Sequence, residues 1–327
     1  MGMKTLRERA ISTPTLQHSN TPILRLLRSF GLLLIASVIP LLSSSCATVD
    51  AVTGRNVYNM YTVDDDIKLG QEAMAANLAE LEKSSTRIDA DPAQVAKLNE
   101  MMRKIVAVSD MPQLPYRVTL IHTNIVNACA MPGGQMIVFQ GLYDGKDALV
   151  KDDDELAAVM AHEIAHVNCR HTTERMSKIM TAAAVMEIAA AVADNNDAAD
   201  VATAIRAVFA VGTLLYIPMY SRSDEAEADR VSLFYMAKAG YDPRAAPRIW
   251  QRVHQKEQEE PGVLDKAMSI FSTHPSGKDR FKDMSKMVPY AMEEYVKVVG
   301  SYPKGYNPAE HPDAVGLNFD WRNPPPK

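Results

Sequence analysis

The chain has 327 residues, of which 47% are hydrophobic, so it is long enough to form one sizeable domain with a continuous core. Its formal net charge of −5 argues against a nucleic-acid-binding protein. The 19 methionines and the low aromatic content of 6% favour helix-rich packing, and no internal repeat is visible in the sequence.

The N-terminal 45 residues have the pattern of a targeting segment. Arg25 and Arg28 form a positive region, and the apolar run over 30–42 is too short to span a bilayer comfortably. Three serines then precede Cys46, as in a bacterial lipoprotein signal, although the first serine stands where an apolar residue is usual. We predict a signal peptide over 1–45 and lipidation at Cys46, with a plain signal peptide or an uncleaved anchor as alternatives. The alanine after Cys46 would direct such a lipoprotein to the outer membrane, on the periplasmic side of a bacterial cell envelope.

Two short stretches before the middle of the chain predict strands. Residues 116–122 alternate between polar and apolar side chains, as in a half-buried strand. Residues 136–140 form a second apolar run, which the chain reaches through a Pro-Gly-Gly turn at 132–134. Together these stretches predict a small antiparallel sheet.

The most specific pattern in the chain is H-E-I-A-H over 162–166. Positions i and i+4 share one face of a helix, so His162 and His166 can reach one metal ion. Glu163 lies about 100° round the helix, where it can act on a water molecule at that metal. The acidic residues at 152–155 favour a helix start, and the apolar stripe behind them predicts burial, in which two unpaired histidines would be costly. The pattern therefore indicates a zinc hydrolase site rather than two ordinary helix histidines.

A zinc hydrolase needs a third protein ligand, and the helix predicted over 223–239 offers one. A serine can cap its start, and Gly240 ends it. Glu225 and Asp229 share a face, and because the fourth zinc position must stay open to water, we assign them unequal roles. Glu225 is the ligand, and Asp229 accepts the free ring N–H of a ligating histidine. We expect Glu227 to be solvated; the alternative for the whole segment is a charged, exposed helix start.

Two alanine-rich stretches, 176–193 and 201–216, are apolar and helical in composition. Each carries charge, and alanine rather than leucine dominates, so we expect a soluble helical pair that shields the site, with a membrane hairpin as the alternative. The chain beyond Tyr302 lacks periodicity and is expected to be a tail, ordered on the surface or disordered. We expect Cys129 and Cys169 to be unpaired thiols, with a disulfide between them as the alternative.

Taken in chain order, these motifs resemble the HtpX and CAAX-prenyl-protease type of zinc metallopeptidases, the gluzincins. Besides HExxH and the E-x-x-A-D segment, three further segments match this family. They are an opening helix at 64–70, an N-A-x-x-x-P-G-G strand and turn at 127–134, and S-T-H-P at 272–275 with Arg280 following. The resemblance extends from about residue 64 to about residue 287. The layout is similar to that of bacterial periplasmic lipoprotein members, without the tetratricopeptide domain that some of them carry.

The resemblance implies an α+β, mainly α-helical fold, in which a zincin-like metallopeptidase domain has its active-site helix beside the small antiparallel sheet. We place this domain at 64–292, after a linker at 46–63 and before a C-terminal tail at 293–327. The resemblance also implies one Zn²⁺ per chain, with Glu163 as general base. The zinc ligands that it implies are His162, His166 and Glu225.

The family also indicates how substrate binds. In other HExxH peptidases the edge strand, here 127–131, lies beside the active-site helix, where it can capture an extended peptide by main-chain hydrogen bonds. A purely structural hairpin is the alternative. The substrate-binding candidates are Asn127, Gly133, Gly134 and Arg280.

The tetrahedral oxyanion of a peptidase needs a further electrophile. The candidates are His274, Arg280 and Tyr220. His274 has two other possible roles: it can occupy the open zinc position and hold the enzyme latent, or it can be a capping or packing residue.

These inferences predict a zinc-dependent endopeptidase of the bacterial cell envelope that hydrolyses misfolded or unassembled proteins and is attached to the membrane through Cys46. One alternative is an envelope chaperone or assembly factor with latent or weak protease activity, although a structural zinc site has no use for Glu163. The other is a membrane-embedded prenyl-protein protease, against which the lack of several long apolar spans counts. Substrate preference and oligomeric state are not predicted.

Overall fold

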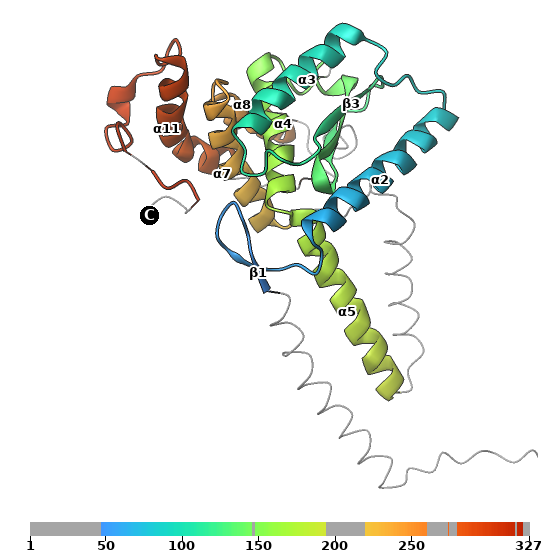
Figure 1. Ribbon diagram of the computed structural model, residues 1–327. Coiled ribbons are helices and arrows are strands. Elements are labelled where there is room, and N and C mark those ends of the chain that lie inside the picture. Colours follow the sequence, from blue (N-terminus) through green and yellow to red (C-terminus); the bar gives the residue numbers. More distant parts are fainter. Residues whose placement is uncertain are drawn as a thin grey trace, which may run out of the picture.

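The computed structural model describes residues 47–145, 148–193, 220–259, 274, 280–317 and 319–322. The predicted signal peptide, the lipidation site Cys46 and the alanine-rich stretch at 201–216 lie outside the described residues. Within the described part, helices surround a small sheet (Figure 1). The predicted α+β, mainly α-helical class is confirmed.

The sheet that lies beside the central helices has three strands in the described part of the chain. They are β3 (Arg117–Ile121), β4 (Ala128–Ala130) and β5 (Gln135–Phe139), in the order β3-β5-β4. β4 pairs antiparallel with β5, whereas β3 pairs in parallel with the other edge of β5. Because the chain passes through β4 before it reverses into β5, β3 and β5 run in the same direction. Both predicted strands are present, but the sheet is mixed rather than antiparallel throughout.

The centre of the molecule is the packing of helix α4 (Asp153–Asn168) against helix α7 (Arg222–Lys238). Asp152 caps α4 by accepting a hydrogen bond from the amide of Glu155. Ser221 caps α7 in a capping box with the third residue of the helix. Both helices are buried on nearly all sides, so the polar side chains that they carry need buried partners.

Three further helices cover this pair. α3 (Pro92–Ala107) packs against β3 and α4, α8 (Ala245–Glu259) against α4 and α11, and α11 (Arg280–Val299) against α7. The predicted active-site helix therefore lies between the sheet and a layer of helices, where water has little access.

Helix α2 (Val63–Lys83) lies against the Pro-Gly-Gly turn η1 (Pro132–Gly134). Gly133 has a φ of 71°, and a Cβ there would come within 2.4 Å of the α2 backbone. Gly70 of α2 makes the reciprocal approach, because a Cβ on it would lie 1.8 Å from the carbonyl oxygen of Pro132. Only glycine at both positions permits this close approach of the two backbones. The glycine of the opening-helix motif and that of the Pro-Gly-Gly motif are therefore needed for the same contact.

The stretch predicted as a linker folds onto the body. β1 (Ala47–Val49) and β2 (Asn56–Tyr58) form an antiparallel hairpin. Val52 in its turn is fully buried in the main core, and the Asn59 side chain donates a hydrogen bond to Thr173. The hairpin therefore packs onto the body, and the domain start at residue 64 stays a prediction.

The predicted C-terminal tail is ordered on the body where the structure describes it. The rings of Phe319 and Trp321 stack against Phe234 of α7, with centroids 6.1 and 5.6 Å away. Trp321 is buried in the main core, so this segment adds to the folded domain. Burial of the Trp321 ring and partial burial of the Phe319 ring hold this segment on the body.

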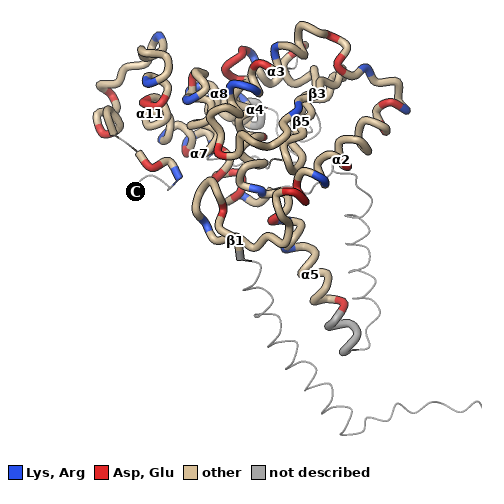
Figure 2. The backbone as a smooth tube through the Cα atoms, in the orientation of Figure 1, with Lys and Arg blue, Asp and Glu red and all other residues tan. Residues whose placement is uncertain are grey.

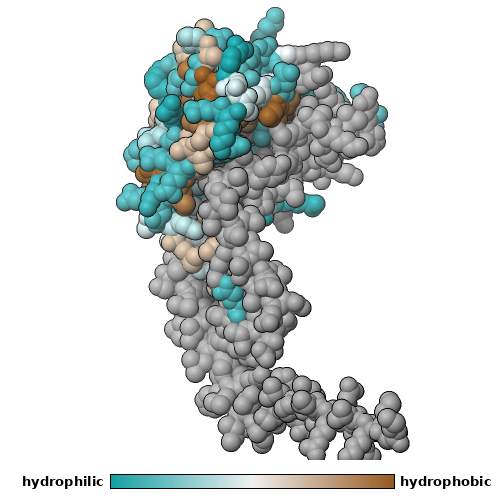
Figure 3. Space-filling model, turned by 90° about the vertical axis from the view of Figure 1, so that its right-hand side faces the viewer, coloured by the Kyte–Doolittle hydropathy of each residue, from teal (hydrophilic) through white to brown (hydrophobic). Residues whose placement is uncertain are grey.

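Helix α5 (His171–Ala193) begins beside α4 and extends away from the rest of the body in Figure 1. Three of the four charged residues of α5 lie within its first eight residues, so most of its outer part is uncharged, as Figure 2 shows where it describes the helix. Among the described residues, no helix is both long and apolar enough to cross a membrane. The face of the described body in Figure 3 is mainly hydrophilic, with small hydrophobic areas between the polar ones.

Candidate metal centre

Helices α4 and α7 bring the three predicted zinc ligands together. The Nε2 atoms of His162 and His166 are 3.0 Å apart. One oxygen of Glu225 lies 3.4 Å from His162 Nε2, and the other lies 3.5 Å from His166 Nε2. All three side chains are buried. The i and i+4 spacing on α4 and the single carboxylate from α7 thus produce one convergent set of nitrogen and oxygen donors.

This donor set fits zinc. A tetrahedral zinc ion with bonds of about 2.0–2.1 Å separates its ligand atoms by about 3.3–3.4 Å, close to the separations within the set. Burial lowers the pKa of His166 well below its ordinary value, so this imidazole is neutral, as a ligand must be. Burial acts to raise the pKa of Glu225, but the neighbouring imidazoles outweigh it and hold the carboxyl group ionised.

Asp229 and Arg280 form a layer behind the ligands. Asp229 Oδ1 lies 3.1 Å from His162 Nδ1, the nitrogen that faces away from the ligand cluster. Arg280 donates two hydrogen bonds to Asp229, at 2.8 and 2.6 Å, and its third nitrogen lies 2.8 Å from Glu225. The guanidinium group also lies 3.6 Å from the centre of the Trp250 ring. Arg280, predicted to contact substrate or oxyanion, lies in the structure against Asp229 and Glu225.

Glu163 points toward the same cluster from one side. Its Oε2 accepts a hydrogen bond of 2.9 Å from the amide of Ala130, and its Oε1 lies 3.2 Å from His274 Nε2. Ala130 belongs to β4, so the edge strand lies beside the active-site helix as expected. A small apolar pocket that includes Val159 and Trp250 in its lining opens onto His162, Glu163 and His274.

His274 is the fourth member of the cluster. Its Nδ1 lies 2.9 Å from Glu225 Oε1 and 3.4 Å from His162 Nε2. Burial acts to lower the pKa of His274, but the carboxylates of Glu225 and Glu163 outweigh it and raise the pKa to about 10. The structure thus brings His274 to the ligands, and its neighbours in the S-T-H-P segment lie outside the described residues.

Tyr220 covers the other side of the cluster. Its ring stacks on that of His166, with centroids 3.8 Å apart and planes 16° apart. Its hydroxyl group lies 3.0 Å from the hydroxyl of Thr172, and burial raises the pKa of Tyr220. The Tyr220 ring therefore packs on His166, and the Tyr220 hydroxyl group points toward α5.

The remaining substrate-binding candidates lie apart from the ligands. Gly133 and Gly134 are buried in the turn that packs against α2, and a Cβ on Gly134 would lie 2.9 Å from the Tyr116 ring. These contacts account for both glycines without a substrate. Asn127 is buried where the chain enters β4. Cys129 and Cys169 are free thiols, as expected.

His171 and Glu227 were not predicted to belong to the site. His171 Nδ1 lies 2.8 Å from His166 Nδ1, and His171 Nε2 lies 3.0 Å from Glu227 Oε2. Glu227 is buried and pairs with Arg55 at 3.1 Å, so the prediction that it is solvated is wrong. Burial acts to raise the pKa of Glu227, but His171 and Arg55 outweigh it and lower the pKa to about 2.

Cys169, His171 and Glu227 also lie close enough together to form a second donor group. Burial and the nearby carboxylates raise the pKa of Cys169 well above its ordinary value. A thiol that keeps its proton is a poor metal ligand. The cluster around His162 is therefore the better metal centre.

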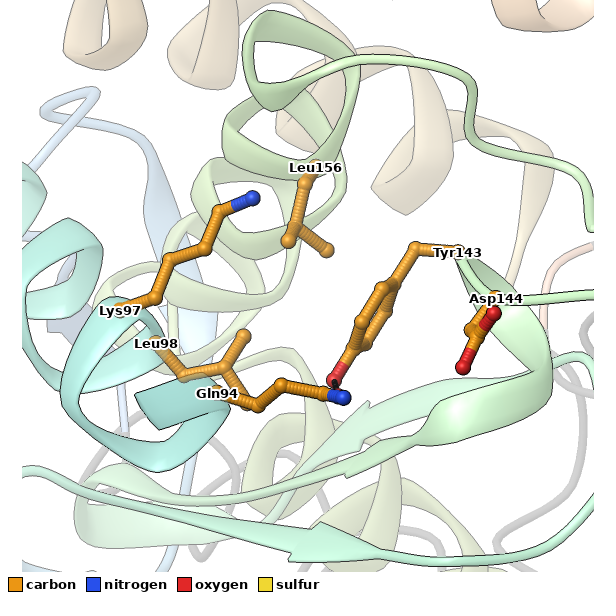
Figure 4. Close-up of a pocket in the computed structure, with 6 residues that line it drawn as sticks. All are labelled: Gln94, Lys97, Leu98, Tyr143, Asp144 and Leu156. Carbon is orange, nitrogen blue, oxygen red and sulfur yellow. Dashed lines mark hydrogen bonds between the residues drawn. The ribbon is translucent and has the colours of Figure 1, made fainter. Parts of the chain in front are cut away.

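A separate cavity of about 310 Å³ lies between α3, the chain after β5 and the start of α4 (Figure 4). Its lining consists of Gln94, Lys97, Leu98, Tyr143, Asp144 and Leu156. The Tyr143 hydroxyl group donates a hydrogen bond of 2.6 Å to Gln94 across it. It shares no residue with the ligand cluster.

Comparison with known proteins gives consistent matches. The sequence model of peptidase family M48 matches residues 92–288. The mitochondrial metalloendopeptidase OMA1 of Schizosaccharomyces pombe is 29% identical over 240 residues, which are 73% of this chain and 66% of the relative. The OMA1 of Arabidopsis thaliana is 34% identical over 178 residues, 54% of this chain and 32% of the relative. The beta-barrel assembly-enhancing protease of Escherichia coli K12 is 25% identical over 260 residues, 74% of this chain and 51% of the relative. The chain therefore spans 32% to 66% of the length of these relatives.

Proposed function

Because the chain belongs to peptidase family M48, we propose that it is a zinc-dependent endopeptidase that hydrolyses misfolded or unassembled proteins in a bacterial cell envelope. The resemblance to zinc metallopeptidases that the motifs indicated is thereby confirmed. The observation that carries the proposal is the convergence of His162, His166 and Glu225, with a second acidic residue, Glu163, at the side of the cluster. A zinc ion that served structure alone would not need that carboxylate.

The chemistry follows from the positions of the residues. Zinc, when bound, lowers the pKa of a coordinated water toward neutrality and polarises a carbonyl group. Glu163 takes the proton from the attacking water and delivers it to the leaving amine. The hydrogen bond from the Ala130 amide fixes Oε2 of Glu163, which orients the carboxylate for this transfer.

Substrate binding is supported by the position of β4 at the edge of the sheet. β4 pairs with β5 on one side, and its other side faces α4 at the level of Glu163. A loosened or unfolded chain can lie along such an edge by main-chain hydrogen bonds, which read backbone rather than side chains. The apolar pocket beside Glu163 is suited to accept one apolar side chain from that chain. We therefore propose unfolded protein segments as substrates.

His274 supports the latent form that the sequence left open. Its Nδ1 lies among the donors and its Nε2 faces Glu163, so His274 would fill a fourth zinc position only after losing the proton that the carboxylates of Glu225 and Glu163 favour. If His274 occupies that position, His274→Ala opens it to water, and casein cleavage rises several-fold. A large fall in the rate would instead assign His274 to the oxyanion, and an unchanged rate would leave it a packing residue.

The location in the cell envelope rests on the predicted lipoprotein signal with Cys46 and on the bacterial relative, named a beta-barrel assembly-enhancing protease. The mitochondrial relatives show that the family is not confined to that compartment. Labelling with a radioactive or clickable fatty acid tests the anchor: label is incorporated by the natural chain and lost in Cys46→Ser.

The activity is tested on the full chain purified in detergent, with zinc content and casein cleavage measured together. Glu163→Gln is compared with the natural chain and with Glu100→Gln, a matched change on the exposed surface of α3. We expect one zinc per chain in all three, with cleavage lost only in Glu163→Gln, by a factor of about 10²–10⁴. Zinc without cleavage by the natural chain would favour the chaperone alternative if His274→Ala were also inactive. A chain that binds no zinc would overturn the proposal.

A further inference from the structure

We infer that His171, Glu227 and Arg55 form a relay that positions the zinc ligand His166 and connects it to the N-terminal hairpin. The inference rests on the proposed zinc site, and it assigns these three residues as positioning residues rather than catalytic ones. The relay starts at His166 Nδ1 and runs through His171 and Glu227 to Arg55, with separations of 2.8, 3.0 and 3.1 Å. His171 and Glu227 are buried, so solvent does not compete for these contacts.

The backbone places His171 against His166 by a sharp reversal. Helix α4 ends at Asn168 and α5 begins at His171. Between them Arg170 has a φ of 54°, in the left-handed region that most residues avoid. Arg170 is held there by a hydrogen bond from its guanidinium group to Asp66. This reversal turns the imidazole of His171 back toward the ligand five residues before it.

Binding of zinc fixes the direction of every hydrogen bond in the relay. His166 faces the other donors through Nε2, so Nε2 must lack a proton and Nδ1 must carry one. The His166 Nδ1–H then donates to His171 Nδ1, which must be the bare nitrogen of that ring. His171 therefore carries its proton on Nε2 and donates it to the Glu227 carboxylate. A ligating histidine usually donates to a carboxylate directly; here one imidazole is inserted between them.

Arg55 holds the far end of the relay. Its NH2 group lies 3.1 Å from Glu227 and donates to Glu174 at 2.9 Å, and its NH1 donates to Glu174 at 3.2 Å. Arg55 directly precedes β2 and is anchored by the buried Val52 of the same hairpin. Figure 1 shows this hairpin below α7, next to the start of α5. Arg55, in a segment that directly follows the predicted lipid anchor, is thus connected to a zinc ligand by three successive side-chain contacts.

The relay is tested by zinc affinity, measured by competition with a chromophoric chelator on the full chain in detergent. His171→Leu removes the acceptor for His166 Nδ1–H and should weaken zinc binding by about 10–100-fold. His171→Asn keeps an oxygen acceptor near the place of Nδ1 and should stay within about threefold of the natural chain. His254→Leu, a change to a histidine that bonds Gln258 on the surface of α8, is the matched control and should have no effect.

A second readout separates positioning from folding. Zinc raises the melting temperature of a chain that binds it in the folded state, by an amount that follows affinity. In His171→Leu the zinc-dependent rise should shrink while the melting temperature without zinc changes little. A purely structural residue would lower both melting temperatures together, and that result, or unchanged zinc affinity in His171→Leu, would overturn the inference.

Glu227→Gln and Arg55→Met extend the test along the relay. Their effects on zinc affinity should decrease with distance from the metal, about tenfold and about threefold. Arg103→Met, which breaks an exposed pair on α3, is the control for Arg55→Met. If the natural chain bound no zinc, the proposed function itself would fail; if it bound zinc and the relay variants bound it equally well, only the relay would fail.

Discussion

Two chains of side-chain contacts, here called arms, support the two proposed zinc ligands of α4, His162 and His166, and the arms differ in length and burial. On one arm His162 faces Asp229, which is held by Arg280. On the other arm His166 faces His171, which is held by Glu227 and Arg55. In both arms the carboxylate comes from α7 and the arginine from another part of the chain.

The arms differ at their outer ends. The side chain of Arg280 is 8% exposed and packs on Trp250, whereas that of Arg55 is 39% exposed. A buried ion pair is strongly coupled to the fold, while an exposed one is screened by water. The short arm should therefore serve stability as well as zinc binding, and the long arm mainly the position of His166.

The largest expected effect is the loss of Asp229. Asp229→Ala leaves Arg280 buried with only part of its ionic contacts, which should lower the free energy of unfolding by about 3–5 kcal/mol. Glu227→Ala on the long arm should cost about 1–3 kcal/mol, since Arg55 keeps Glu174 and the solvent. Urea unfolding followed by circular dichroism measures both. Equal losses, or a larger loss for Glu227→Ala, would remove the distinction between the arms.

Removal of the metal should affect both arms, because His162 and His166 are proposed to bind the same ion. Zinc present at about 1,000 times its dissociation constant stabilises a folded protein by about 4 kcal/mol, so a chelator should lower the melting temperature by several degrees. The chain should remain folded, because both carboxylate–arginine pairs are formed by protein side chains alone. Glu225→Ala should show no response to the chelator. A response as large in Glu225→Ala as in the natural chain would place the metal elsewhere.

A third carboxylate, remote from both arms, provides a reference for acid stability. Burial acts to raise the pKa of Glu155, but hydrogen bonds from Arg252, Lys151 and Arg248 outweigh it and lower the pKa from its ordinary 4.5. The folded state therefore favours the carboxylate, so its contribution is complete above pH 4.5 and is lost as the pH falls toward the folded-state pKa. Glu155→Gln should be less stable by about 2–3 kcal/mol at pH 7. The difference from the natural chain should shrink below pH 4.5, and a difference that stayed constant with pH would contradict this account.

The smallest effect on stability should come from Arg55. Arg55→Met removes a partly exposed pair and should lower the free energy of unfolding by about 1 kcal/mol or less. Arg280→Met should cost about 3 kcal/mol or more, because Asp229 and Glu225 then lose a buried partner. Thermal unfolding without zinc compares the two. An Arg55→Met variant as unstable as Arg280→Met would mean that the hairpin, and not the arm, sets the stability.

The short arm was largely predictable from local spacing. His162 and His166, and likewise Glu225 and Asp229, are four residues apart on helices, so each pair shares a face whatever the rest of the fold. The capping signals and apolar stripe located α4 within a residue of its observed start. Helix geometry of this kind needs no long-range information.

The long arm was not predictable because it depends on contacts between distant residues. Glu227 is two residues from Glu225, and residues at that spacing normally lie on different faces of a helix. The burial of Glu227 depends on its pairing with Arg55, 172 positions earlier in the chain. The position of His171 depends on the chain reversal at Arg170. The sequence pattern does not reveal that this residue has a positive φ. The prediction of an antiparallel sheet was wrong for the same reason. Tertiary packing decides which edge of β5 a strand joins, and β3 joins it in parallel.

The most direct test is a crystal of the protein grown with zinc and measured on both sides of the zinc absorption edge. The account predicts a single anomalous peak about 2.0–2.2 Å from His162 Nε2, His166 Nε2 and a Glu225 oxygen. A peak at Cys169, His171 and Glu227 instead, or no peak at the first cluster, would contradict the central claim.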